Sequence, residues 1–191
     1  MSAFKTIAKP SEGIYKEKGS KFFAFAVPIK NEQEVKSYIA QKRKEHIQAV
    51  HVCSAFRIGA DLKLFRFSDD GEPSNSAGPP ILGQIQAYGL TNVLIAVVRY
   101  YGGTNLGVGG LISAYRNAAK DALENAQIIL KEESIDQQFT FPYEKLHLVM
   151  EFLKREKIQI LKQEIGSLCL IKVSIERYRQ KEIESSLKSW E

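Results

Sequence analysis

The pattern of apolar and polar positions predicts five strands in the first two thirds of the chain. Residues 11–30 have the pattern of two strands joined near residues 18–20, and Phe23, Phe25 and Val27 share one face of the second strand. Three further strands are predicted at residues 49–58, 62–67 and 91–100. The last of these is apolar on both faces, which is typical of a central strand.

Apolar residues at helical spacing predict three helices among these strands. The first covers residues 31–47, with Asn31 as its N-cap. A short helix over residues 81–88 is favoured by the Pro79-Pro80 pair that precedes it. The third helix follows a glycine-rich segment and faces the core with Leu111, Ala114, Tyr115, Ala118, Ala119, Ala122 and Leu123. Because most of these side chains are small, we expect this helix to lie close against the sheet.

The composition becomes polar near residues 131–136, which indicates a linker between two domains. We assign residues 1–133 to a first domain and residues 134–191 to a smaller second domain. Residues 137–190 have the pattern strand, helix, strand, strand, helix. This βαββα order resembles a ferredoxin-like arrangement without its last strand, so the expected fold class is α+β.

The composition is that of an ordinary soluble protein, with 44% hydrophobic and 26% charged residues among 191. The longest aliphatic run, Val93–Val98, has six residues, so we expect neither a membrane span nor an export signal. Two distant cysteines, Cys53 and Cys169, favour a reduced, cytoplasmic setting. The net charge is +5, and residues 1–135 hold 17 basic and 13 acidic side chains. This excess permits phosphate-rich partners without requiring them.

The segment between the central strand and the third helix contains five glycines: Gly102, Gly103, Gly107, Gly109 and Gly110. Bare backbone at a helix entry offers free amides and the positive end of the helix dipole to an anion. The named phosphate fingerprints are absent, because Val108 stands at the Walker lysine position and Ile112 at the third glycine of the dinucleotide motif. Contact with a generic anion or a nucleic-acid backbone is one interpretation, and a tight turn with close helix packing is the other.

Arg99 ends the apolar strand, where a permanently charged guanidinium needs a partner. The loop at residues 68–74 offers Asp69, Asp70 and Glu72, and an ion pair with one of them would bring both segments into one site. Asp70 and Glu72 are then the candidates for a general base. In the alternative interpretation, Asp70-Gly71 is a turn and Asp69 is an Asx cap.

Two incomplete sets of metal ligands are present. The three loop acids would suit magnesium together with a ligand phosphate, although adjacent acids in a turn are usually solvated. His51 and Cys53 share a strand face and would begin a zinc site or a thiol–base pair, or form a half-buried structural pair. No second HxC or CxxC element completes a zinc site. We therefore expect no metal and no cofactor.

Basic and aromatic side chains that would contact phosphates and stack on bases are scattered through the first domain. They include Lys42, Arg43, Lys44, Arg57, Arg66, Arg99 and Arg116, with Phe65, Phe67, Tyr100 and Tyr101. Charges of this kind are also common on solvated faces. No recognition-helix or ribonucleoprotein motif is present.

Several blocks of this sequence resemble, in the same order, the signature blocks of the IMPACT family. They are GSKF at 19–22, HVCSAFR at 51–57, RFSDDGEPS at 66–74, AG at 77–78 with PIL at 80–82, and RYYGGTNLGVGGLISAY at 99–115. The resemblance covers most of residues 12–125. The two-domain layout is similar to that of the family's bacterial branch.

The resemblance implies a first domain like the second domain of a small-subunit ribosomal protein, with a βαβ-rich sheet and helices on one face. It implies a second domain similar to the ferredoxin-like last domain of elongation factor G. The implied function is regulation of translation by binding RNA, the ribosome or a protein of the translation apparatus. Two residues depart from the family pattern, because Asn105 stands where lysine is common and Ser113 where arginine is frequent. The proposed anion site therefore lacks two cations.

We expect the binding site in a groove between the loop at residues 68–74 and the glycine segment. Its anion ligands are expected to be Arg99 and the five glycines, and its other lining residues Arg66, Ser68, Asp69, Asp70, Glu72, Ser74, Tyr100, Tyr101 and Arg116. A binding protein is the favoured class, since no activated nucleophile is visible. The alternatives are a hydrolase or transferase for a small phosphorylated or acyl substrate, and a scaffold recognised through the second domain.

Overall fold

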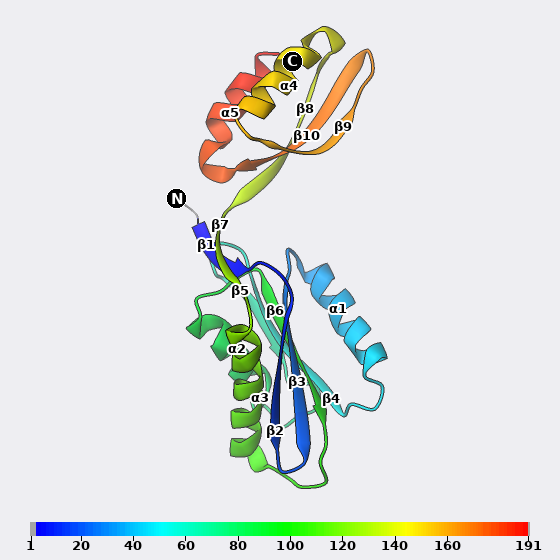
Figure 1. The fold of residues 1–191 in the computed structure, drawn as a ribbon, viewed down its shortest axis with the longest axis vertical. Coiled ribbons are helices and arrows are strands. Elements are labelled where there is room, and N and C mark those ends of the chain that lie inside the picture. Colours follow the sequence, from blue (N-terminus) through cyan, green and yellow to red (C-terminus); the bar gives the residue numbers. More distant parts are fainter. Residues whose placement is uncertain (1–2, 191) are drawn as a thin grey trace. The chain divides into compact units, whose positions relative to one another are not determined.

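The computed structural model describes residues 3–190, which divide into one compact unit at residues 4–131 and a second that contains residue 3 and the residues from 132 onward. Up to residue 132 the elements are β1 (Ala3–Ile7), β2 (Ser11–Glu17), β3 (Ser20–Pro28), α1 (Glu32–Glu45), β4 (His51–Ile58), β5 (Leu64–Ser68), α2 (Gly78–Ala87), β6 (Val93–Tyr100), α3 (Gly107–Glu124) and β7 (Ile128–Glu132). Figure 1 shows their arrangement. No helix in the described part of the chain is long and apolar enough to cross a membrane.

Five strands of the first unit form an antiparallel sheet in the order β2-β3-β6-β4-β5. The sequence predicted a central strand at residues 91–100, and β6 confirms it, since residues 93–99 are all buried. Arg99 on β6 lies opposite Phe22 on β3 and opposite His51 on β4. The register therefore places these three residues in one row across the sheet.

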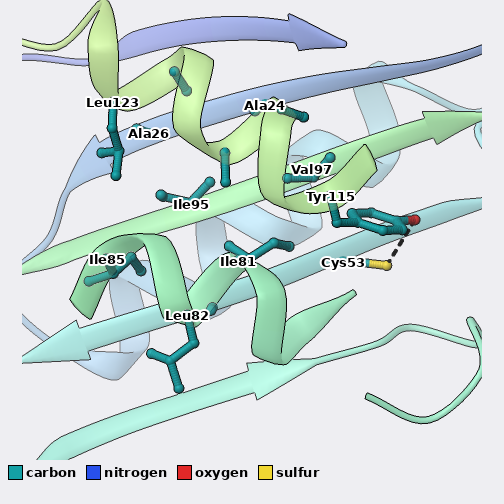
Figure 2. Packing of buried hydrophobic residues seen from close by; sticks show 14 of the residues in the cluster. Ala24, Ala26, Cys53, Ile81, Leu82, Ile85, Ile95, Val97, Tyr115 and Leu123 are labelled. Carbon is teal, nitrogen blue, oxygen red and sulfur yellow. Dashed lines mark hydrogen bonds between the residues drawn. The ribbon is translucent and has the colours of Figure 1, made fainter. Parts of the chain in front are cut away.

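Helices cover both faces of this sheet, so the expectation of helices on one face is wrong. Helices α2 and α3 pack on the face that carries Ala24, Cys53 and Ile95, as Figure 2 shows. Helix α1 packs on the other face, where Val35 contacts a cluster with Val27. The physical reason is that β3 is apolar on both sides, and either side left bare would expose a large hydrophobic surface to water.

Helix α3 lies close against the sheet, as its small residues predicted. Its core-facing residues are fully or almost fully buried, from Leu111 to Leu123. A Cβ atom on Gly13 of β2 would lie 2.2 Å from the backbone nitrogen of Ala122, so glycine is required there. Ser11 and Asn125 add hydrogen bonds between β2 and the end of α3.

Strands β1 and β7 form a separate two-stranded sheet that the sequence pattern did not predict. The next strand, β8, begins at Ser134, so regular strands occupy most of the segment expected to be a linker. Their pairing partners lie more than a hundred residues apart in the sequence, which no local pattern encodes.

The second unit has the element order that the sequence predicted. Its elements are β8 (Ser134–Pro142), η1 (Tyr143–Lys145), α4 (Leu146–Arg155), β9 (Gln159–Glu164), β10 (Leu168–Glu176), η2 (Arg177–Arg179) and α5 (Gln180–Lys188). The strands form an antiparallel sheet in the order β8-β10-β9. Alternate residues of β10 are buried, so one face of the sheet packs against α4 and α5 in a core that includes Val149, Ile171 and Ile183.

Candidate functional site

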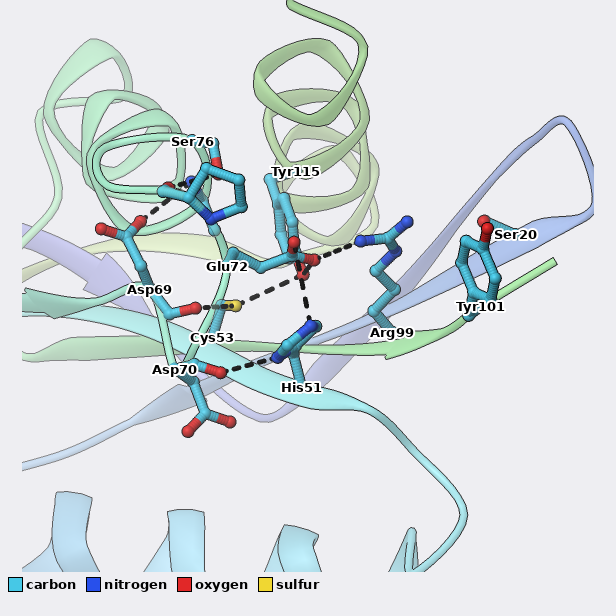
Figure 3. Close-up of polar contacts among 12 residues, drawn as sticks. Ser20, His51, Cys53, Asp69, Asp70, Glu72, Ser76, Arg99, Tyr101 and Tyr115 are labelled. Atoms are coloured by element: carbon cyan, nitrogen blue, oxygen red, sulfur yellow. Dashed lines mark hydrogen bonds and ion pairs between the residues drawn. The ribbon is translucent and has the colours of Figure 1, made fainter. Parts of the chain in front are cut away.

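A buried ion pair joins the loop at residues 68–74 to the end of the central strand. Arg99 Nη1 donates to Glu72 Oε1 at 2.6 Å, and the two side chains are 7% and 3% exposed. The expected pairing of Arg99 with an acid of this loop is thus present, and Glu72 is the partner (Figure 3). Because each charge is shielded from water by protein, each depends on the other.

Helix α3 contributes to the same pair through Tyr115. The Tyr115 hydroxyl donates to Glu72 Oε1 at 2.7 Å, and burial, with the adjacent thiol and carboxylate, raises the pKa of this phenol. His51 approaches from β4, with Nε2 3.8 Å from Glu72 Oε2. Three separate segments, β4, β6 and α3, therefore meet on one loop carboxylate.

Asp69 is a structural cap. Its carboxylate accepts backbone N–H bonds from Asn75, Ala77 and Gly78 at 2.8, 3.0 and 2.8 Å. Two of these groups belong to the start of α2, whose N-cap residue makes no side-chain hydrogen bond of its own. The interpretation of Asp69 as a capping residue accounts for this geometry.

Asp70 ties the loop to β4 and α1. Its carboxylate accepts from the Val52 N–H at 2.6 Å and pairs with Arg43 of α1. Asp70 and Gly71 have φ values of 46° and 87°, so the chain turns sharply here. Of the two candidates for a general base, Asp70 therefore has structural partners at both oxygens, and Glu72 is paired with Arg99.

His51 and Cys53 lie on the same face of β4, as the alternation predicted. His51 Nδ1 is 2.7 Å from the Asp70 carbonyl oxygen, a contact that places its proton on Nδ1. Cys53 Sγ lies 3.0 Å from the Asp69 carbonyl oxygen and 3.3 Å from the Tyr115 hydroxyl. Burial raises the pKa of this thiol, so it stays protonated and is a poor nucleophile. Among the described residues, no three potential ligands are grouped to hold a metal ion.

The glycines after β6 serve different purposes. A Cβ on Gly102 would lie 2.0 Å from the carbonyl carbon of Gly19, so this position needs glycine for a close backbone approach. Gly103 and Gly107 have φ values of 86° and 72°, which favour glycine for conformational reasons. A Cβ on Gly109 would meet nothing within 4 Å, so packing does not explain this residue.

Helix α3 begins without a side-chain cap. Its N-cap residue, Leu106, makes no side-chain hydrogen bond, and the first turn contains no acidic residue. Gly107 and Gly109 are exposed, so backbone N–H groups of the first turn face solvent. A cavity of about 200 Å³ adjoins this turn and is lined by Tyr15, Glu17, Lys18, Leu106, Gly110 and Ser113.

The remaining residues expected in the groove are divided between the two faces of the sheet. Arg99 points to the face of α2 and α3, whereas Tyr100 and Arg66 belong to the opposite face, where Arg66 pairs with Glu32 at 3.3 Å. Ser68 and Ser74 are exposed at the ends of the loop, and Arg116 is exposed on α3. The residues that were expected to line one groove therefore do not form a single surface.

Two aromatic rings lie beside Arg99, and only one of them, Tyr101, was expected in its groove from the sequence. The Arg99 guanidinium carbon lies 5.5 Å from the Phe22 ring centre and 5.6 Å from the Tyr101 ring centre. Tyr115 was expected only as a core residue, and its hydroxyl role was missed. Strand register links Phe22 to Arg99, but that pairing becomes visible only in the folded sheet.

Comparisons with known proteins identify the family of this chain. The family model of the "Impact N-terminal domain" matches residues 18–123. An IMPACT family member from Thermus thermophilus is 39% identical over 73% of this chain and 75% of its own length. The Escherichia coli member YigZ is 29% identical over 98% of this chain and 93% of its own length. The crystal structure of a hypothetical protein is similar over 99% of this chain and 93% of its own chain. The TM-score is 0.78 and the identity is 29%. This chain belongs to the IMPACT family.

Proposed function

We propose that this protein binds RNA, on its own or on the ribosome, and acts in the regulation of translation. The observation that carries the proposal is the start of α3, where exposed glycine backbone leaves N–H groups open beside Lys18. Such a helix start attracts phosphate through its N–H groups and through the helix dipole. The bound phosphates would lie at this cavity, between the start of α3 and the turn that carries Lys18.

The loop acids do not oppose this binding as strongly as their sequence suggests. Asp69 accepts hydrogen bonds from backbone N–H groups, Asp70 forms an ion pair with Arg43, and Glu72 forms an ion pair with Arg99. The charges of Asp70 and Glu72 are therefore paired with cations within the protein, and the Asp69 carboxylate is occupied by backbone N–H donors. This arrangement supports an outer surface that attracts phosphate.

Arg99 has a different part in this proposal from the one expected from sequence. Its side chain is 7% exposed and already paired with Glu72, so it positions the two segments and does not itself hold the phosphate. The link to translation rests on the resemblance of the two domains to parts of translation factors and ribosomal proteins. A protein partner of the translation apparatus would reach the same surface.

The proposal is tested by measuring the affinity of the full chain for a fluorescent, unstructured RNA as salt is increased from about 50 to about 200 mM. Phosphate contacts predict that log K falls linearly with log salt, by about 0.7 for each phosphate held. Binding that does not respond to salt, or no binding at the lowest salt, would exclude this function.

A further inference from the structure

A second cavity lies where β3 begins and β6 ends, with Phe23 and Tyr100 on the α1 face of the sheet and Tyr101 in the segment that follows β6. Its volume is about 440 Å³, and it is lined by Gly19, Lys21, Phe23, His46, Tyr100 and Tyr101. That volume falls within the range of roughly 300–1,000 Å³ typical of small-molecule sites. Four of its six lining residues carry aromatic rings, so a flat ligand would find surfaces on which to stack.

The strand register fixes three of these side chains relative to one another. Lys21 on β3 lies directly opposite Tyr100 on β6, and Phe23 follows on the same face. The rings of Phe23 and Tyr100 meet edge to face, with centres 5.9 Å apart. His46 Nδ1, at the end of α1, is 2.8 Å from the Tyr100 hydroxyl oxygen. These contacts hold the lining side chains in place without a ligand.

Tyr101 offers the most accessible ring. It is 49% exposed, and its hydroxyl is 3.2 Å from Asn105 Oδ1. The buried Arg99 guanidinium lies 5.6 Å from the ring centre, a cation–π contact that helps to hold the ring in place. These two contacts restrain the ring, and about half of the residue's surface remains open to a stacking partner.

The charge of the lining selects the kind of ligand. Lys21 is exposed at the cavity, and no acidic side chain belongs to the lining among the described residues. An aromatic cage for a cation would be weakened by this ammonium group, whereas a flat ligand bearing a phosphate would be favoured by it. We infer that this cavity binds one base of single-stranded RNA and that Lys21 contacts the adjoining phosphate. The inference rests on the proposed function and assigns it a site for a base.

The test separates bases from phosphates. Fluorescent oligo(U) of about ten nucleotides is compared with an abasic ribose-phosphate oligomer of the same length and charge, using the full chain. We expect oligo(U) to bind about tenfold more tightly, because stacking on an aromatic side chain typically contributes an effect of this size or larger. Tyr101→Ala should remove that difference, and Tyr101→Phe should keep it. Tyr143→Ala, at a tyrosine that is 56% exposed in the second unit, is the matched control.

Each result decides between the two claims. Equal binding of both oligomers, or a base preference that survives Tyr101→Ala, overturns the base site and leaves the proposed function intact. Binding of neither oligomer overturns both claims. Lys21→Gln provides a second check, because it should weaken oligo(U) binding severalfold without removing the preference for bases. An unchanged oligo(U) affinity in this variant would exclude the phosphate contact.

Discussion

Gly102 and Gly19 lie backbone against backbone, where the segment after β6 crosses the turn between β2 and β3. A Cβ on Gly102 would come within 2.0 Å of Gly19 and 2.2 Å of the Ser20 nitrogen. The Gly102 N–H also donates to the Ser20 hydroxyl at 3.1 Å. This contact joins the glycine segment to the turn that carries Lys18.

Gly102→Ala should therefore destabilise the first unit, because its methyl group cannot be accommodated without moving two backbone segments. We expect a loss of about 2 kcal/mol or more in the free energy of unfolding, measured with urea. Gly109→Ala is the control, since its Cβ has open space and lies within a helix, where alanine is favoured by about 0.5–1 kcal/mol. Equal stability of the two variants would contradict the close-approach argument.

Glu72 is predicted to matter more for stability than Tyr115. Glu72→Gln leaves Arg99 buried without its counter-charge, a change that typically costs about 3–5 kcal/mol. Tyr115→Phe removes the hydrogen bond to Glu72 and the one from Cys53 but keeps the ion pair, so a loss of about 1–2 kcal/mol in the free energy of unfolding is expected. Urea unfolding of both variants checks the order, and a larger loss for Tyr115→Phe would show that the ion pair contributes little.

Because Asp69 caps the start of α2, its replacement should destabilise the α2 side of the sheet. Asp69→Ala removes the acceptor of three backbone N–H groups, and about 2 kcal/mol of stability should go with it. Asp69→Asn, which keeps one acceptor oxygen, should lose less. Hydrogen exchange of the Ala77 and Gly78 amides gives a local readout, and unchanged protection in Asp69→Ala would rule out the cap.

Some of these features follow from local sequence and others do not. Residues 22–27 are apolar at every position, so both faces of that strand required cover, and the one-sided sheet could have been rejected from the sequence alone. Alternation correctly placed His51 and Cys53 on one face. By contrast, the hydroxyl of Tyr115 and the choice of Glu72 as partner depend on three distant segments meeting, which hydrophobic periodicity does not report.

The buried thiol of Cys53 predicts a loss of stability at alkaline pH. Burial raises its folded pKa above that of the unfolded chain, so below about pH 8.5 both states hold the proton and no penalty arises. Above that pH the unfolded thiol releases its proton while the folded thiol retains it, and unfolding becomes more favourable. Cys53→Ala should flatten part of this decline in urea unfolding between about pH 8 and about pH 10. An identical decline in the variant would contradict the assignment.

The central claim is that the start of α3 holds RNA phosphates, and a charge placed there tests it most directly. Gly109→Asp fits in open space and adds a carboxylate that competes for the helix N-terminus, while Gly83→Asp makes the same change at an open position of α2. The measurement is the affinity of each variant for the same short RNA at low salt. We predict that Gly109→Asp weakens binding about tenfold or more and that Gly83→Asp changes it by about twofold or less. Equal effects of the two substitutions would contradict the claim.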